Sequence, residues 1–386
     1  MCGVAAVVAL FAAGCGGDSD KTAEVVSGAS ASAARSGDAG SAGFPVKVTD
    51  CAGAETTFTA APKKVVTSNA SSLEMLFWLG AGDRVVGTGF PPGKGTMPAP
   101  FAAQAERVEV LGDMVIPKEK LLASGADLYI DTFADMSGMG AMGSGPSPKE
   151  FAAAGIKHIY LKSTACASKR AGAQEDLTEV EADIRQLGAV TGTSARAEEL
   201  VAGMRQTVGT VRGALAGLPQ DRRPTYFFFD FDAGTKQPIA VCGKQVANAV
   251  ITQAGARNVF ADCAGDFKPV SWEDVVGRNP EWIQLGVRDK GSAEANAKAF
   301  DEAERFLRTF DATKGLPAVR DGKFVRVGSE RTTIAGVRNA GTVREIAGRI
   351  HPDLVEPGAG AAPGAGSGAG PGTAAPSASA SAPAAG

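Results

Sequence analysis

The sequence predicts an α/β fold with two lobes, each a mostly parallel sheet flanked by helices, joined by one long helix. Three observations support this prediction. Short β-branched runs alternate with one-sided helical patterns, which is typical of parallel sheets covered on both faces. This alternation occurs in both halves of the chain, and an uninterrupted helical pattern separates them. Residues 45–355 of the 386-residue chain are also long enough for two hydrophobic cores.

The first half begins with a predicted hairpin over residues 46–58 and continues into a βαβ unit. In that unit a β-branched run is followed by small polar residues, a one-sided helix, a Gly-rich stop and a second β-branched run. We expect strands at 65–67, 85–88, 108–111, 128–130 and 158–161, and helices at 73–79, 118–123, 147–154 and 177–190.

The segment 194–218 predicts a single long helix. Its apolar residues keep helical spacing throughout, and Pro219 ends the pattern. A helix of this length would extend about 35 Å. The predicted N-terminal lobe is therefore 45–193, and the predicted C-terminal lobe is 219–355.

The second half repeats the alternation of strands and helices. Its first run, at 225–229, has three consecutive phenylalanines and is typical of a buried strand. The last helix should end at His351, which precedes Pro352. We expect strands at 225–229, 258–260, 282–285 and 324–327, and helices at 246–254, 272–276 and 343–350.

Several short segments resemble one known family. They are PKKVVTS at 62–68, EMLFWLGAGDRVVG at 74–87, AGARNVF at 254–260, VSWE at 270–273 and LPAV at 316–319. Together, in this order, they resemble the periplasmic-binding-protein family that serves ABC importers of iron-siderophores, haem and cobalamin. The resemblance covers residues 46–354 and implies a stiff helical connection between two lobes.

The resemblance also implies a function. It predicts a monomeric substrate-binding protein that captures an iron-siderophore between its lobes and delivers it to an ABC permease dimer, whose ATPase supplies the energy. Haem, cobalamin or a copper complex are alternative ligands on the same fold. A secreted enzyme on a two-lobe α/β frame is the alternative from another class. We expect no enzymatic activity and no cofactor, because the sequence has no phosphate-binding loop, zinc-protease motif or nucleophile elbow.

The N-terminal residues resemble a lipoprotein signal. Residues 4–13 are apolar but too short to span a bilayer, and they precede Ala-Ala-Gly-Cys, which resembles a lipobox ending at Cys15. The stretch before residue 4 has no Lys or Arg, which departs from the usual pattern and suggests a start further upstream. We predict a signal peptide at 1–14, lipidation of Cys15 and a location on the outer face of the cytoplasmic membrane.

Two segments of low complexity flank the predicted lobes. Residues 15–44 form a predicted flexible tether, and residues 356–386, rich in Gly, Ala, Pro and Ser, form a predicted disordered tail. The formal net charge of −3 is near balance, and no basic stripe interleaved with aromatic residues is present. Nucleic acid is therefore not an expected partner.

Four cysteines remain after the signal peptide and Cys15. An even number in an exported protein favours disulfides. Three pairings are possible. We expect Cys51–Cys166 and Cys242–Cys263, because each of these pairs would stay within one lobe.

Ligands of open parallel sheets bind beyond the carboxyl ends of the strands. The loops at these positions are 68–71, 89–91, 113–114, 132–133, 230–232, 288 and 330–331, together with Trp272. Arginines can pair with the oxygens of a large polar ligand, and aromatic rings can lie against its scaffold. The predicted ligand-binding residues are Ser68, Asn69, Phe90, Phe231, Trp272, Arg288 and Arg331.

Two glutamates are candidates for permease docking. Glu74 lies off the apolar stripe of its predicted helix and should face solvent, and Glu273 lies in the first turn of a helix capped by Ser271. In the resembled family, a glutamate of each lobe contacts arginines of the permease dimer. The resemblance therefore assigns docking to Glu74 and Glu273.

We predict no metal site. His158 and His351 are the two histidines of the chain, and they are too few for a multi-histidine site. Met136, Met139 and Met142 are spaced by three in a Gly-rich loop. Thioethers favour Cu(I), but methionines that adapt to ligand shape in a lid explain the same pattern.

Overall fold

The computed structural model describes residues 43–132 and 145–356. Within these two ranges, no helix combines the length and the apolar character needed to cross a membrane. The predicted signal peptide, Cys15, most of the tether, nearly all of the tail and the methionine-rich loop lie outside the described residues.

The predicted hairpin is confirmed. Strands β1 (Val46–Thr49) and β2 (Glu55–Phe58) are antiparallel, with Val46 opposite Phe58. The disulfide Cys51–Cys166 ties the turn of this hairpin to the end of helix α5 (Lys162–Ala165). The hairpin is therefore fixed to the first lobe by a covalent link.

The first sheet has five parallel strands in the order β5-β4-β3-β6-β7. The central strand β3 lies between β4 and β6, so the chain reverses its direction of travel across the sheet at this point. That reversal is where parallel sheets open a crevice for ligands. The strands are β3 (Val65–Thr67), β4 (Val85–Gly89), β5 (Glu109–Gly112), β6 (Leu128–Asp131) and β7 (Lys157–Tyr160).

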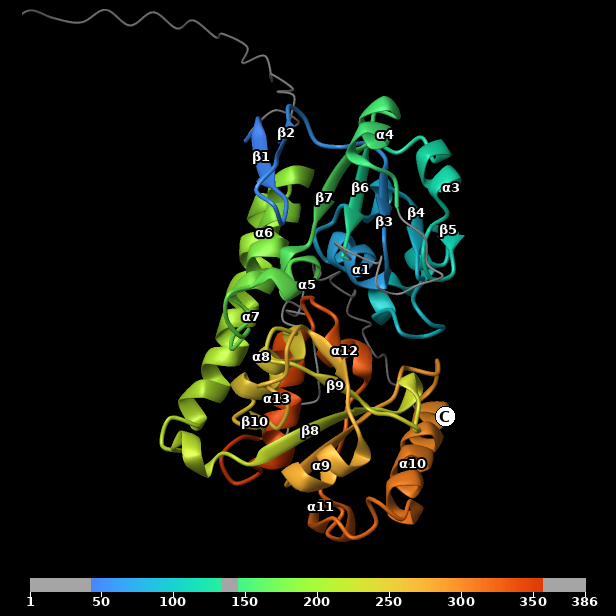
Figure 1. The fold of residues 1–386 in the computed structure, drawn as a ribbon. Helices are drawn as coiled ribbons and strands as arrows, with labels where there is room; N and C mark the ends of the chain where they lie inside the picture. Colours follow the sequence, from blue (N-terminus) through green and yellow to red (C-terminus); the bar gives the residue numbers. More distant parts are fainter. Residues whose placement is uncertain (1–42, 133–144, 357–386) are drawn as a thin grey trace, which may run out of the picture. The chain divides into compact units, whose positions relative to one another are not determined.

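Short helices alternate with these strands. In Figure 1 they flank the sheet of the first lobe, and α6 lies at its side and ends at Thr191, whose carbonyl accepts a hydrogen bond from Arg84 of that lobe. The helices are α1 (Ala70–Trp78), α2 (Ala102–Ala105), α3 (Lys118–Ala123), α4 (Pro148–Ala153), α5 and α6 (Thr178–Thr191).

The long helix α7 (Ser194–Ala214) packs against helices of both lobes. Figure 1 shows it beside α6 of the first lobe and beside α8 and α13 of the second. Its apolar face, with Leu200, Met204 and Val211, belongs to one hydrophobic cluster that includes residues of both lobes. The two sheets are therefore connected by continuous apolar packing rather than by a pair of extended strands.

The second sheet has four parallel strands in the order β10-β8-β12-β13. A separate antiparallel pair, β9 with β11, lies in the same lobe and is tied by the disulfide Cys242–Cys263. Both predicted disulfides are therefore present. The strands are β8 (Thr225–Asp230), β9 (Ile239–Val241), β10 (Arg257–Asn258), β11 (Phe267–Pro269), β12 (Trp282–Gly286) and β13 (Phe324–Arg326).

The helices of the second lobe separate these strands. Its buried core contains Phe227, Phe229, Ile283 and Leu285 from the two middle strands. The helices are α8 (Val246–Gln253), α9 (Trp272–Arg278), α10 (Ala293–Thr309), α11 (Pro317–Arg320), α12 (Ser329–Thr333) and α13 (Asn339–Ile350).

The structure corrects several details of the sequence interpretation. Helix α10 and the β9–β11 pair are absent from the predicted elements, and the long helix ends at Ala214 rather than near residue 218. The strand expected at 258–260 ends at Asn258, because the Asn258 side chain accepts a hydrogen bond from the Phe260 amide and turns the chain.

Candidate functional site: a cavity between the lobes

A cavity of about 540 Å³ lies between the carboxyl ends of the strands of the two sheets. The first lobe lines it with residues that follow β3, β4, β5 and β6. The second lobe lines it with residues that follow β8, β12 and β13 and with the loop between α12 and α13. Both sheets therefore present their strand ends to one space, as expected for a ligand site in parallel α/β folds.

On the first lobe, a network of hydroxyl and amide groups forms one side of the cavity. Asn69 caps α1 by accepting hydrogen bonds from the amides of Ser71 and Ser72, and its Nδ2 donates to Thr132 Oγ1 at 2.7 Å. Ser68 Oγ lies 2.9 Å from the same Thr132 oxygen. The polar groups that follow β3 and β6 are therefore held by one another before any ligand binds.

Phe90 follows β4 and has a strained backbone. Its φ of +29° lies in the left-handed region, which is uncommon for an aromatic residue. Its carbonyl accepts a hydrogen bond from the Ala70 amide at 3.1 Å, which joins the strand end to the start of α1. The ring lies 5.9 Å from the Arg288 guanidinium of the second lobe. This places an aromatic face and a cation on facing sides of the cavity.

On the second lobe, several charged residues line the cavity. Asp230 ends β8, Arg288 and Asp289 follow β12, and Glu330 lies in α12 after β13. Burial raises the pKa of both Asp230 and Glu330, although Arg288 and Arg338 respectively oppose this rise. Glu330 Oε2 is buried with no hydrogen-bond partner among the described residues.

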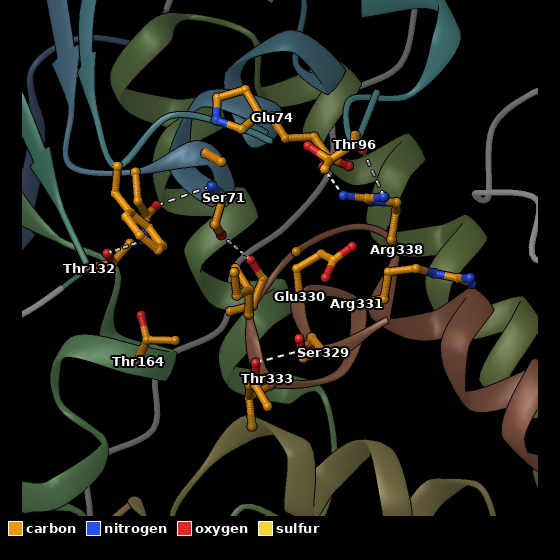
Figure 2. A pocket seen from close by; sticks show the side chains of 18 of the residues that line it. Ser71, Glu74, Thr96, Thr132, Thr164, Ser329, Glu330, Arg331, Thr333 and Arg338 are labelled. Atoms are coloured by element: carbon orange, nitrogen blue, oxygen red, sulfur yellow. Dashed lines mark hydrogen bonds and ion pairs between the residues drawn. The ribbon is translucent and has the colours of Figure 1, made fainter. Parts of the chain in front are cut away.

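The expectation that Glu74 faces solvent is wrong. Glu74 is 8% exposed, its Oε2 pairs with Arg338 Nη2 at 2.6 Å, and its Oε1 accepts a hydrogen bond from Trp78 Nε1. Figure 2 shows Glu74 and Arg338 turned toward each other across the cavity, with Thr96 beside the guanidinium. The Glu74 side chain points toward the second lobe, where the Arg338 guanidinium neutralises its charge.

Further contacts join the lobes around the cavity. Ser71 Oγ donates to the Ala335 carbonyl at 2.5 Å. Gly95 and Gly291 approach so closely that a methyl group on Gly95 would lie 2.6 Å from Cα of Gly291. Both glycines have positive φ, so a side chain would be strained as well as obstructed. The cavity is therefore bounded by direct contacts between the two lobes.

Two predicted wall residues do not line the cavity. Trp272 is 5% exposed, packs in the second core against Phe229 and Phe306, and donates its indole N–H to the Thr235 carbonyl. Phe231 packs against the same core and is not among the lining residues. Both rings pack against Phe229 in the core of the second lobe instead of facing the cavity.

The remaining predicted ligand residues differ in how they meet the cavity. Asn69, Phe90 and Arg288 line it, whereas Ser68 is buried behind Thr132. Arg331 lines the cavity, but Figure 2 shows its side chain extending away from Glu330, and its guanidinium pairs with Glu345 at 2.5 Å.

Several cavity residues escape the sequence reasoning, among them Phe267 and Arg338. Phe267 is 45% exposed and lies on β11, a strand of the antiparallel pair that the sequence interpretation lacks. Arg338 precedes α13 in a segment without a strand end, so the rule used for the other residues could not find it. Met114, which follows β5 and is 50% exposed, belongs to a predicted cleft loop. Phe267 and Met114 together with Phe90 give the cavity an apolar rim.

Two parallel-sheet lobes with a shared cavity define a two-lobed binding protein. Residues 65–330 match the family described as periplasmic binding protein. The uncharacterized ABC transporter substrate-binding lipoprotein YvrC of Bacillus subtilis (strain 168) is 25% identical over 311 residues, which are 80% of this chain and 87% of that protein. The chain belongs to the periplasmic binding protein family. It is a substrate-binding protein of an ABC transporter rather than an enzyme.

Solved structures have the same fold. A periplasmic binding protein from Veillonella parvula dsm 2008 superposes with a TM-score of 0.65 and 25% identity, covering 80% of this chain and 97% of that chain. A protein of an ABC-type Fe3+-hydroxamate transport system from Saccharomonospora viridis DSM 43017 gives a TM-score of 0.62 and 22% identity, covering 80% and 99%.

Proposed function

We propose that this protein captures a ferric siderophore in the cavity between its lobes and presents it to an ABC permease. The observation that carries this proposal is the cavity itself, with an apolar rim and the Arg288 guanidinium over the Phe90 ring. A siderophore complex has an organic scaffold around a cluster of iron-binding oxygens. The rim suits the scaffold, and the guanidinium can donate hydrogen bonds to the oxygens. The Fe3+-hydroxamate description of one protein with the same fold is compatible with this class.

A binding titration tests the ligand class. Trp78 is a suitable reporter, because its indole N–H donates to the cavity residue Glu74. Ferric siderophores, haem and cobalamin would each be added to the full chain while tryptophan fluorescence is followed. We expect saturable quenching at one-to-one stoichiometry with at least one ferric siderophore. Saturable binding of haem or cobalamin alone would contradict the proposal.

Arg288 provides a site-specific test. Arg288→Ala should weaken siderophore binding by about tenfold, since it removes a charge-assisted donor from the cavity. The matched control is Arg278→Ala, whose guanidinium lies 4.6 Å from the Phe260 ring outside the cavity. The control should bind as the unmodified chain does. Equal siderophore affinities of the unmodified chain and both variants would show that Arg288 does not contact the ligand.

We propose that Glu273, on the second lobe, contacts the permease. It is exposed in the first turn of α9, beside the Ser271–Asp274 capping box. The glutamate predicted to dock from the first lobe, Glu74, is buried and held by Arg338, so it is not free to meet a permease. The docking proposal therefore rests on Glu273 alone.

A charge reversal tests this contact. Glu273→Lys should lower uptake in cells that carry the cognate permease, while ligand affinity of the purified chain stays unchanged. The matched control is Glu294→Lys, which reverses an exposed first-turn carboxylate on α10 of the same lobe. Equal uptake by the two variants would contradict a specific role for Glu273.

The lipid anchor is a separate part of the proposal. We propose that Cys15 is lipidated and holds the chain at the outer face of the cytoplasmic membrane, as the lipoprotein name of the Bacillus subtilis relative suggests. Cys15→Ser should abolish incorporation of a labelled fatty acid and move the chain from the membrane fraction to the soluble fraction. Retained labelling in this variant would exclude Cys15 as the site.

A further inference from the structure

The charged side chains that line the cavity are not balanced. Among the described lining residues there are five carboxylates and three guanidinium groups, and no lysine or histidine. The lining is therefore acidic overall. The carboxylates belong to Glu74, Asp230, Asp266, Asp289 and Glu330, and the guanidinium groups to Arg288, Arg331 and Arg338.

Two of the three guanidinium groups are already neutralised by protein carboxylates. Arg338 pairs with Glu74 at 2.6 Å, and Arg331 pairs with Glu345 at 2.5 Å. An anionic ligand would have to compete with these carboxylates for either arginine. Arg288 is left as the cavity guanidinium without an ion pair in the described part of the chain.

The other four carboxylates have no cation at ion-pair distance within residues 43–132 and 145–356. Backbone and amide N–H groups bind them instead. Asp289 Oδ1, for example, accepts hydrogen bonds from the Gly291 amide at 2.8 Å and from Asn296 Nδ2 at 2.9 Å. Such bonds orient a carboxylate but supply no compensating positive charge, although burial raises the pKa of Asp230 and of Glu330 and so favours their neutral forms. The second lobe therefore presents net negative charge to the ligand.

Two oxygens at the same side of the cavity lack hydrogen-bond partners. Ser329 is 2% exposed and its Oγ has no partner among the described residues, and the same holds for Glu330 Oε2. Buried polar atoms are normally satisfied, so these two oxygens lack a polar partner that a ligand or its water can supply. Both residues lie in the first turn of α12 and line the cavity.

We infer that the cavity selects a neutral or cationic ferric chelate and rejects a polyanionic one. This inference rests on the proposed siderophore function and narrows it to one charge class. Like charges repel more in a partly enclosed site than in bulk water, because the effective dielectric constant is lower there. Carboxylates without a cation partner should therefore repel a negatively charged tris-catecholate chelate. The same carboxylates should accept hydrogen bonds from the ammonium group of a hydroxamate chelate.

A matched pair of chelates tests the charge preference. Ferric desferrioxamine B carries one ammonium group, and its N-acetyl derivative has the same iron centre without that charge. The full chain should bind the ammonium form about tenfold more tightly than the acetylated form, and a trianionic ferric tris-catecholate should bind at least about a hundredfold more weakly than either. The preference should shrink as ionic strength rises.

Variants that replace a cavity carboxylate by the amide of the same shape test whether the charge preference arises in the cavity. Glu330→Gln and Asp289→Asn should each reduce the ratio between the two hydroxamate affinities by about threefold. The matched control is Asp311→Asn, which removes an exposed carboxylate outside the cavity and should leave the ratio unchanged. Thermal melting of each variant confirms that it is folded.

The outcomes separate the two proposals. Tighter binding of the tris-catecholate than of the acetylated hydroxamate would overturn the charge inference and leave the siderophore function standing. An unchanged ratio in both cavity variants would also overturn it. Failure of all three chelates to bind, with saturable binding of haem or cobalamin, would overturn the siderophore function itself.

Discussion

The two lobes build their sides of the cavity with different chemistry. The first lobe contributes mostly hydroxyl, amide and apolar groups, and its one lining carboxylate among the described residues, Glu74, is paired with Arg338. The second lobe contributes Asp230, Asp289 and Glu330, whose charges are not paired by cations in the described chain. Residues at the strand ends of a parallel sheet form each side of the cavity. The same architecture therefore presents a mostly uncharged surface on the first lobe and an acidic surface on the second.

The first lobe therefore mainly fixes the shape of the cavity, and the second lobe mainly sets its charge. On the first lobe, Asn69 and Thr132 satisfy each other, so their positions are set before a ligand arrives. On the second lobe, Ser329 and Glu330 retain oxygens without partners among the described residues, so binding can satisfy them. The first lobe therefore provides a preorganised wall, and the second lobe provides the acidic groups on which the inferred charge selection depends.

The largest expected effect compares the two disulfides. Cys51–Cys166 spans 115 residues of the first lobe, and Cys242–Cys263 spans 21 residues of the second. Loop-closure entropy predicts that replacing the first pair by serines costs about 5 kcal/mol of unfolding free energy, and the second pair about 3 kcal/mol. Urea denaturation of both double variants measures the difference. A larger loss for the second pair would reverse the comparison.

Breaking the ion pair between the lobes should have the next largest effect. Arg338→Met leaves the Glu74 carboxylate buried with only the Trp78 indole as donor, which should cost about 3 kcal/mol of stability. The control Lys47→Met breaks an exposed pair with Glu55 and should cost at most about 1 kcal/mol. Urea denaturation again provides the measurement, and similar losses for both variants would show that the Glu74 site tolerates an unpaired charge.

A comparison of helix caps sharpens the contrast between the lobes. Asn69→Ala removes the cap of α1 and the hydrogen bond to Thr132, and should cost about 2 kcal/mol. Ser271→Ala removes only the cap of α9 and should cost about 1 kcal/mol. Equal costs in chemical denaturation would mean that the Asn69–Thr132 bond adds nothing to stability.

The smallest expected effect concerns pH. Burial raises the pKa of Glu330 in the folded chain, so its contribution to stability is fully present below the unfolded pKa and is lost as pH rises through the folded pKa. Glu330→Gln should therefore flatten the decline in stability with rising pH. Hydrogen bonds with Ser271 lower the pKa of Asp274, so the contribution of Asp274 to stability is lost as pH falls through its folded pKa. Asp274→Asn should therefore reduce the loss of stability at low pH. Melting temperatures measured across pH distinguish the two slopes.

Much of the fold could be predicted because its signals are local. The run at β8, the Ser271 cap of α9 and the alternation of strands with helices are visible in short windows of sequence. Helix α10 was missed although it is amphipathic, and the β9–β11 pair was missed because its strands are short and pair across a loop. Because the β9–β11 pair is absent from the predicted elements, Phe267 is absent from the predicted site.

The sequence by itself determined the class of fold and the strand ends that face the cavity, since periodicity and capping act over short distances along the chain. The division into two lobes favoured the cysteine pairing that the structure shows. Only the tertiary structure decided which side chains serve the cavity. Glu74 is buried because Arg338, 264 positions away, meets it across the lobes, and Trp272 is turned into a core by neighbours that its own helix does not contain. Burial and charge pairing depend on contacts between distant segments, and no local pattern encodes them.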